Sequence, residues 1–242
     1  RHAVGIACLQ ETHTTLLEAQ RLRRRWRGQL YATHYSAYAR GALVWVRAGV
    51  PFVELESVID PMGRYALVLG RLDGRMVVLG SIYAPNVEQV LFHQELSRVL
   101  APWSVYPWLL GGDFNAVLDT GLDRSFPPLS IAAAGGLAAG LREWLGQWHL
   151  RDVWRSRYPT DKEYTHYSAV HRLHVRIDRF VGTDEILLHI TKMEHLGRTH
   201  SDHNPVYLRI EWDSSAPPIP GWRLQPAMLE DNLIRGAIGD FI

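Results

Sequence analysis

A carboxylate and a carboxamide stand two residues apart where an apolar stretch of the chain ends. Asp113 and Asn115 belong to the segment GGDFN at 111–115, which follows the apolar run 107–110. Alternate residues of an extended chain point to the same side, so a strand here would present both groups together. Three more polar segments end strand-like runs: LQET at 9–12, RID at 176–178 and SDHNP at 201–205. Acidic, amide and imidazole groups at several strand ends favour an enzyme site.

These groups suit the hydrolysis of a phosphodiester, which needs a hard cation, a base that orients water and a stabiliser of the developing charge. Glu11 can ligate Mg²⁺, which takes one or two protein carboxylates plus phosphate oxygens and waters. Asp113 can polarise the attacking water, steadied by Asn115. His203, held by Asp178, can contact the phosphate as an imidazolium.

Each residue also has a purely structural interpretation. Glu11 would be a surface residue in a loop, Asp113 the acceptor of an Asx-turn and His203 a satisfied core histidine. Asp178 interrupts the apolar run 175–181, where strand alternation places it on the same face as Arg176. A carboxylate at a strand centre needs a partner, so we expect either Arg176 or a distant histidine to hold it.

Zinc is a weaker hypothesis. His195, His200 and His203 are close in sequence, as are His171 and His174. The chain has no H-E-x-x-H motif and no cysteine pair, and it contains 12 histidines, so such clustering indicates little.

Length and composition indicate the class of protein that carries this chemistry. A chain of 242 residues, 47% hydrophobic and 21% charged, can bury one substantial core. No apolar run approaches the roughly 20 residues that span a bilayer, so we expect no membrane partner. The single cysteine, Cys8, fits a reducing compartment. The net charge of +1 means that a polyanion would have to be met by a local patch.

The elements that must position the site are strands mixed with helices. Thr15 and Glu18 form a capping box at the start of a helix, and Asp73-Gly74 is a hairpin turn. Asn86 is expected to cap a helix from about 87 to 100, and a further helix is expected around 137–147. Short strands alternate with these helices, which favours two sheets packed face to face with helices outside.

The ordered segments LQET, IYAPN at 82–86, GGDFN, RID and SDH resemble the motif series of the endonuclease/exonuclease/phosphatase superfamily. The resemblance implies an α/β (α+β) fold, a four-layered αββα sandwich of two packed mixed β-sheets with outer helices. It places this domain at 1–212 and a linker, with the start of a segment leading toward a reverse transcriptase, at 213–242.

The resemblance also implies the roles of the site residues. Glu11 would bind Mg²⁺, with Mn²⁺ able to substitute, and Asp202 would support the metal or the water. Asp113 would activate water and Asn115 would contact the phosphate. Tyr83 and Asn86 would lie near the scissile phosphate, and Asp178 with His203 would form a dyad.

Two further segments, 116–125 and 164–168, resemble the endonuclease domains of LINE-type (non-LTR) retrotransposon polyproteins, and WRLQP at 222–226 resembles the segment that follows them. Such domains nick one strand of target DNA and leave a 3′-hydroxyl that primes reverse transcription. The implied partners are double-stranded target DNA, a reverse transcriptase domain in the parent chain and the RNA of the element. The implied location is the nucleus, after synthesis in the cytoplasm.

Contacts to DNA are expected from the hairpin 165–176, which by resemblance lies along the minor groove. His166, Tyr167, His171, Arg172 and His174 suit such contacts; without the resemblance, a solvated hairpin would be preferred. The expected DNA-binding residues are Arg40, Asn86, Thr165, Arg176 and Ser201. The arginines at 21–27 form either a nucleic-acid contact or, as we favour, the wet face of an outer helix.

The family's first strand, which carries an Asn of the catalytic cluster, has no counterpart before Val4. We therefore expect this fragment, lacking that strand, to nick DNA poorly or not at all, and the full parent protein to be competent. Two alternatives stay open: another hydrolase of the superfamily, such as an abasic-site repair endonuclease or a phosphatase, and an inactive truncated relic.

Overall fold

The computed structural model describes residues 4–126, 131–170, 172–197 and 201–212. The chain up to Glu211 forms one compact unit. The expected linker and tail at 213–242 lie outside the described residues, so that boundary stays a prediction.

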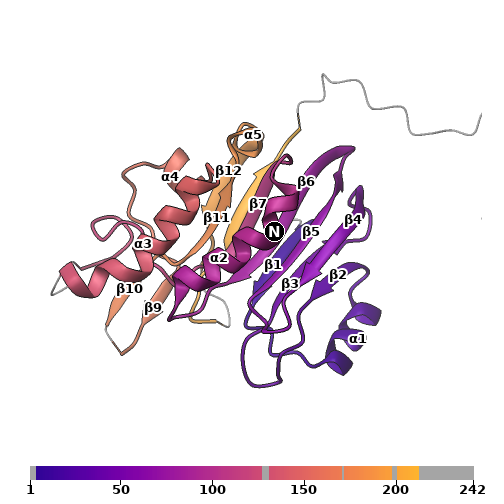
Figure 1. Ribbon diagram of the computed structural model, residues 1–242, viewed down its shortest axis with the longest axis horizontal. Coiled ribbons are helices and arrows are strands. Elements are labelled where there is room, and N and C mark those ends of the chain that lie inside the picture. Colours follow the sequence, from indigo (N-terminus) through magenta and orange to yellow (C-terminus); the bar gives the residue numbers. More distant parts are fainter. Residues whose placement is uncertain (1–3, 127–130, 171, 198–200, 213–242) are drawn as a thin grey trace, which may run out of the picture. The chain divides into compact units, whose positions relative to one another are not determined.

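A six-stranded mixed sheet forms one of the two central layers (Figure 1). Its order is β4-β5-β6-β7-β11-β8, with β6 and β7 parallel and every other neighbouring pair antiparallel. Its strands are β4 (Phe52–Ile59), β5 (Tyr65–Leu72), β6 (Arg75–Tyr83), β7 (Trp108–Asp113), β8 (Arg151–Asp152) and β11 (Asp178–Gly182). The turn Asp73-Gly74 joins β5 to β6 as expected, and both residues have positive φ.

The second layer consists of two antiparallel pieces packed on the large sheet. The first has the order β1-β3-β2 and the second pairs β12 with β13. Their strands are β1 (Ile6–Gln10), β2 (Gly28–Ala32), β3 (Ala42–Arg47), β12 (Ile190–His195) and β13 (Val206–Ile210). β1 packs over β6 and β7, whereas β13 contacts β11. Within the described part of the chain, β1 and β13 each have a single ladder partner.

Helices cover the outer faces of both layers (Figure 1). On the large sheet, α2 (Gln89–Leu100) and α3 (Ile131–Gln147) contact each other. Phe92 of α2 and Trp144 of α3 share one core with Trp108 and Leu110 of β7. Strand residues alternate between faces, so the buried neighbours of these core residues point toward the smaller sheet. The expected four-layered αββα sandwich is confirmed.

On the smaller sheet, α1 (Leu16–Arg25) packs beside β2, with Leu22 and Trp26 against Leu30 and Leu43. Its arginines are exposed, as expected for a wet helix face. The capping box is present: Thr15 Oγ1 accepts from the Glu18 amide, and Glu18 Oε2 accepts from the Thr15 amide at 2.8 Å.

The expected cap at Asn86 is wrong. α2 begins at Gln89, and its N-cap is Glu88, which has φ 55 and makes no side-chain capping bond. The side-chain nitrogen Nε2 of Gln89 instead donates to the carbonyl oxygens of Pro85 and Phe114, both at 2.9 Å. These bonds fasten the loop after β6 to the loop after β7, next to the site residues.

The remaining elements are short: the 3₁₀ turn Ala101–Trp103, α4 (Val153–Arg157), α5 (Asp184–Leu187), β9 (His166–Ser168) and β10 (Leu173–Val175). β9 and β10 pair as an antiparallel hairpin that projects from the sandwich in Figure 1. This hairpin lies within the segment expected to reach into DNA.

Candidate active site

Three of the expected site residues form one row across the large sheet. Asp113 ends β7, and its register neighbours are Tyr83 on the parallel strand β6 and Asp178 on the antiparallel strand β11. Because strands in a sheet lie about 5 Å apart, this register brings the three side chains to one end of the sheet.

The backbone at Asp113 is held in one conformation. Gly112 has φ 156, and a Cβ at this position would overlap the carbonyl oxygen of Ile82, so only glycine fits. Asp113 Oδ1 accepts a hydrogen bond from the Asn115 amide at 2.8 Å. Asn115 has φ 48, and its side-chain nitrogen donates to the Ala84 carbonyl oxygen at 2.8 Å. The loop after β7 is thereby fixed to the loop after β6.

The Asp113 carboxyl is buried beside another acid. Burial first, and then the negative charge of Asp178, raise the pKa of Asp113 to about 7, against the opposing effect of the Asn115 amide. A carboxyl with a pKa near neutrality suits a general base, since it both ionises and accepts a proton readily.

His203 is the partner of Asp178. Its Nδ1 lies 2.8 Å from Asp178 Oδ2. Burial disfavours the charged ring, but the hydrogen bond and charge of Asp178 outweigh it and raise the pKa of His203 to about 9. His203 is therefore an imidazolium at neutral pH, and it faces the site with Nε2. Of the two partners expected for Asp178, the distant histidine is the one observed.

Thr165 positions this dyad. Its side chain is buried, and its Oγ1 accepts hydrogen bonds from the amides of Ile177 at 3.2 Å and Asp178 at 3.1 Å. A buried hydroxyl engaged with the backbone cannot also contact DNA. We therefore withdraw Thr165 as a DNA-binding residue and describe it as a support of Asp178.

Arg176 is also not available to DNA. Its side chain has no exposed surface, and its guanidinium binds Asp123 at 2.9 Å and Asp152 at 2.7 Å. The expected alternation fails because the strand is interrupted between Val175 and Asp178, where the Arg176 amide donates to the Asp123 carbonyl oxygen. Arg176 thus turns into the protein while Asp178 faces the site.

The sequence alone did not identify the role of Asp123. Its carboxylate is fully buried and also binds Arg155 at 2.6 Å. The positive charge of Arg176, with its hydrogen bonds, overcomes the effect of burial and lowers the pKa of Asp123. This network joins the loop after β7 to the base of β11. Asp123 lies in the segment LDRS at 122–125, which is recognisable in sequence but carries no sign of its partner.

Glu11 lies on the other side of the row. It follows β1 with φ 49, and its Oε1 accepts a hydrogen bond from the Tyr83 hydroxyl at 2.6 Å. Gln10, which sequence reasoning passed over, donates to Ser81 Oγ at 2.8 Å and so attaches the end of β1 to β6. Only Oε1 of Glu11 has a partner among the described residues. An exposed carboxylate with a spare oxygen fits a hard cation such as Mg²⁺.

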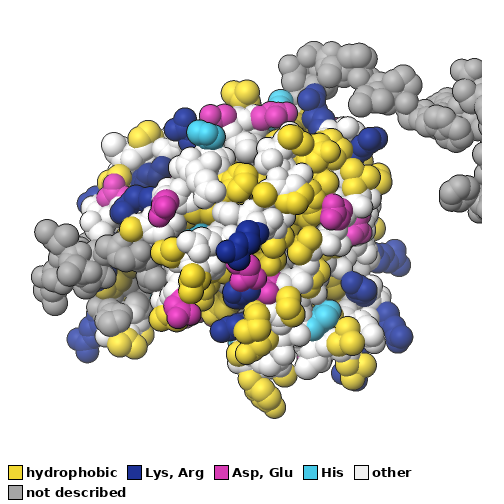
Figure 2. Space-filling view, in the orientation of Figure 1, with side chains coloured by type: hydrophobic (Ala, Val, Ile, Leu, Met, Phe, Trp, Pro, Cys, Tyr) yellow, Lys and Arg dark blue, Asp and Glu magenta, His cyan; other side chains and the backbone are white. Residues whose placement is uncertain are grey.

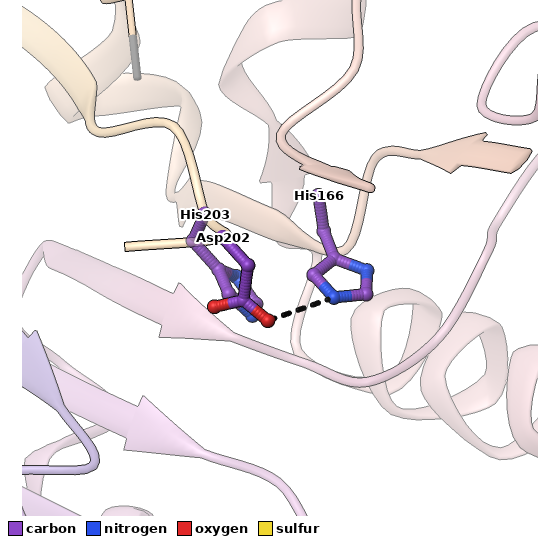
Figure 3. Close-up of side chains that lie close together, drawn as sticks. All are labelled: His166, Asp202 and His203. Atoms are coloured by element: carbon purple, nitrogen blue, oxygen red, sulfur yellow. Dashed lines mark ion pairs between the residues drawn. The ribbon is translucent and has the colours of Figure 1, made fainter. Parts of the chain in front are cut away.

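Asp202 lies next to a histidine that the sequence placed only in the groove-binding hairpin. Asp202 Oδ2 is 3.5 Å from His166 Nε2, and the rings of His166 and His203 are 4.5 Å apart (Figure 3). A backbone bridge between His166 and His203 holds the hairpin against the loop before β13. His166 also lines a pocket of about 450 Å³, together with Tyr167, His174 and Asn204.

Of the other expected DNA contacts, Asn86 and Ser201 are exposed and Arg40 is half-buried. Arg40 stacks over Tyr35 at 4.9 Å and donates to the Met62 carbonyl oxygen at 3.2 Å. Figure 2 shows Lys and Arg side chains scattered over the visible face. A DNA contact would therefore depend on individual residues near the site.

The zinc set considered from sequence is not assembled among the described residues. His195 is half-buried with its ring stacked on Trp154 at 4.1 Å, and desolvation lowers its pKa to about 4. His171 and His200 lie outside the described residues.

The chain is similar to known proteins in both sequence and fold. Residues 1–203 match the Endonuclease/Exonuclease/phosphatase family. The chain is 28% identical over 250 residues to the transposon TX1 uncharacterized 149 kDa protein of Xenopus laevis; this covers 98% of the chain but only 18% of that relative.

Solved structures share the fold. The AP endonuclease LMAP of Leishmania major is 17% identical with a TM-score of 0.69, covering 84% of this chain and 77% of that one. The Xenopus laevis APE2 catalytic domain is 17% identical with a TM-score of 0.68, covering 85% and 83%. No helix in the described part of the chain is long and apolar enough to cross a membrane.

Proposed function

Because the chain belongs to the endonuclease/exonuclease/phosphatase family, we propose that it is the Mg²⁺-dependent endonuclease domain of a retrotransposon polyprotein. It would hydrolyse one phosphodiester of double-stranded target DNA and leave a 3′-hydroxyl primer. The observation that carries this proposal is the cluster of Asp113, Asp178 and His203, whose ligand atoms lie within 4.8 Å of one another. The cluster combines a carboxyl whose pKa lies near 7, Asp113, with a protonated imidazole, His203.

The chemistry of each residue follows from its surroundings. Asp113 accepts the proton of the attacking water, and the Asn115 amide keeps its carboxylate in place. His203 donates from Nε2 to a phosphate oxygen, because Nδ1 is engaged with Asp178. The Tyr83 hydroxyl, whose pKa is raised by burial and by its hydrogen bond to Glu11, stays protonated and orients that carboxylate.

Glu11 would bind the Mg²⁺, for which Mn²⁺ could substitute. Asp202 is proposed to support the metal or the attacking water. When bound, the cation supplies positive charge that offsets the phosphate and the developing oxyanion. Asp202 has a 71% exposed side chain and lies beside His166. Glu11 is therefore the ligand that the geometry supports better.

The retrotransposon context rests on the transposon relative, of which this chain spans about a fifth. A reverse transcriptase domain in the parent chain, the RNA of the element and action in the nucleus belong to the same proposal. Asn86 and Ser201, which are exposed, and Arg40, which is half-buried, are proposed to contact DNA.

A plasmid-nicking assay tests the proposal. Supercoiled DNA with Mg²⁺ is incubated with the wild type, with Asp113→Ala and with His203→Ala; Asp73→Asn, in the remote turn before β6, is the control. Each site variant should lose at least about 10²-fold in rate, which is the usual contribution of a positioned acid or base. Extension of the nick by a DNA polymerase would show the 3′-hydroxyl.

The same assay separates the alternatives. A strong preference for an oligonucleotide with an abasic site would favour a repair endonuclease. Release of phosphate from an inositol phosphate would favour a phosphatase. Nicking that survives both site substitutions would contradict the mechanism.

A further inference from the structure

Three side chains on the hairpin side of the candidate site have the composition of a transition-metal site. His166 Nε2, Asp202 and a ring nitrogen of His203 all lie within 4.8 Å of one another. His166 begins β9, whereas Asp202 and His203 come from the loop before β13, and all three side chains converge in Figure 3. More than thirty residues separate the two segments, so the sequence gives no spacing by which to recognise the set.

The distances suit tetrahedral coordination. Zinc binds imidazole nitrogen and carboxylate oxygen at about 2.0–2.1 Å, which places two tetrahedral ligands about 3.4 Å apart. His166 Nε2 and Asp202 Oδ2 are 3.5 Å apart. The third ligand comes from His203, of which one ring nitrogen lies within 4.8 Å of the other two ligand atoms.

The surroundings also resemble those of metal-binding histidines. Asp178 holds Nδ1 of His203 at 2.8 Å, so Nε2 is the nitrogen directed to a ligand. A carboxylate behind a ligating imidazole is the usual outer partner in zinc sites. The 450 Å³ pocket beside His166 gives an ion a path from solvent.

We infer that His166, Asp202 and His203 form a site for a borderline divalent cation, Zn²⁺, separate from the carboxylate of Glu11 that is proposed to take Mg²⁺. Two imidazoles favour zinc over magnesium, which prefers oxygen ligands. Three protein ligands leave a fourth position open. Zinc would displace the proton on Nε2 of His203, which passes to solvent, and would bind that nitrogen while Nδ1 keeps its bond to Asp178. Because Nε2 is the atom proposed to meet the phosphate, zinc would inhibit nicking; this consequence rests on the proposed function.

Calorimetric titration of the tag-free, metal-free chain with ZnCl₂ tests the site without any activity. We expect one saturable equivalent in the wild type. His166→Gln and Asp202→Asn should each weaken that binding by about 100-fold, since even loss of an outer partner costs 10–100-fold. The matched control is His174→Gln, an exposed histidine on the same hairpin outside the cluster, which should bind as the wild type does.

Melting temperatures close to that of the wild type would show that the variants are folded. Asp202→Asn is the less disruptive variant, because the Asp202 side chain is more exposed than that of His166. Absence of saturable binding in the wild type would overturn the inference. So would binding that neither substitution weakens, because the ion would then lie elsewhere, for example among Asp113, Asp178 and His203.

A nicking assay in Mg²⁺ tests the consequence. Added zinc should inhibit the wild type, and His166→Gln should need about 100-fold more zinc for the same inhibition. If neither this chain nor a version extended with the family's first strand nicks in Mg²⁺ alone, the proposed function fails, while the calorimetry still decides whether the zinc site exists.

Discussion

Asp113 and Asp178 are register neighbours on β7 and β11, and of the two only Asp178 has a hydrogen bond to a histidine, His203. The two carboxyls share one end of the sheet, so the ionised Asp178 opposes ionisation of its neighbour. Burial adds to this effect, and the pKa of Asp113 reaches about 7. This relationship makes Asp113 suitable as a base and also makes it costly to the fold.

The pH dependence of nicking should therefore have two limbs. The rate rises through about pH 7 as Asp113 loses its proton, and it falls above about pH 9 as His203 loses its own. Because a bound cation favours the ionised carboxylate, more Mg²⁺ should shift the lower limb to lower pH. The measurement is kcat/KM across pH at two Mg²⁺ concentrations. A rate that falls between about pH 6 and 8 would contradict the assignment.

Replacing Asp113 with asparagine should stabilise the fold at alkaline pH while abolishing nicking. The folded-state pKa of about 7 lies above the ordinary 3.8, so the folded protein binds the proton more tightly than the unfolded chain. The free energy of unfolding therefore falls as pH rises from about 4 to 7. Asparagine avoids this loss, and we expect Asp113→Asn to gain roughly 1–3 kcal/mol at about pH 8.

Chemical denaturation at about pH 8 and pH 4 measures this effect, and the gain should shrink at the lower pH. Asp73→Asn, at an exposed turn position with φ 52 that asparagine tolerates, is the control and should show no such gain. Equal stability of Asp113→Asn and the wild type at both pH values would argue against a strained carboxylate.

Arg176 is expected to stabilise the fold and not to contact DNA. Arg176→Leu removes the arginine that bridges the buried carboxylates of Asp123 and Asp152 most closely, and we expect a loss of about 3–5 kcal/mol in the free energy of unfolding. Arg40→Gln removes a half-buried arginine that makes one hydrogen bond to Met62 and a ring contact to Tyr35, so its melting temperature should fall far less than that of Arg176→Leu. It should weaken DNA binding and reduce the slope of log affinity against log salt by about 1.

Thermal melts and binding isotherms at several salt concentrations distinguish the two arginines. If Arg176→Leu melts like the wild type and loses only salt-dependent affinity for DNA, Arg176 would be a DNA contact after all.

An added N-terminal strand should improve nicking. β1 has β3 as its single ladder partner, and β13 has only β12, within the described residues. An extended chain that begins with the family's first strand, including its asparagine, could pair with such an edge and add an amide to the catalytic cluster. We expect faster Mg²⁺-dependent nicking and a higher melting temperature than for the present chain. Equal rates in the two proteins would refute this prediction.

The sequence by itself determined the local features of the protein. The capping box at Thr15 and the turn at Asp73-Gly74 depend on residues a few positions apart, and both form as expected. The motif order indicated the family and the αββα fold. Asp113 could be placed at a strand end because the apolar run 107–110 stops beside it, whereas Asp178, expected at a strand centre, begins β11.

Only the tertiary structure decided which partner each polar side chain takes. Arg176 was expected to share a face with Asp178, but the interrupted strand turns it to Asp123 and Asp152. His166 was assigned to a groove-binding hairpin, yet it meets His203 and Asp202. Strand and helix periods act over a few residues, whereas a buried charge is satisfied by whichever group the folded chain brings near it.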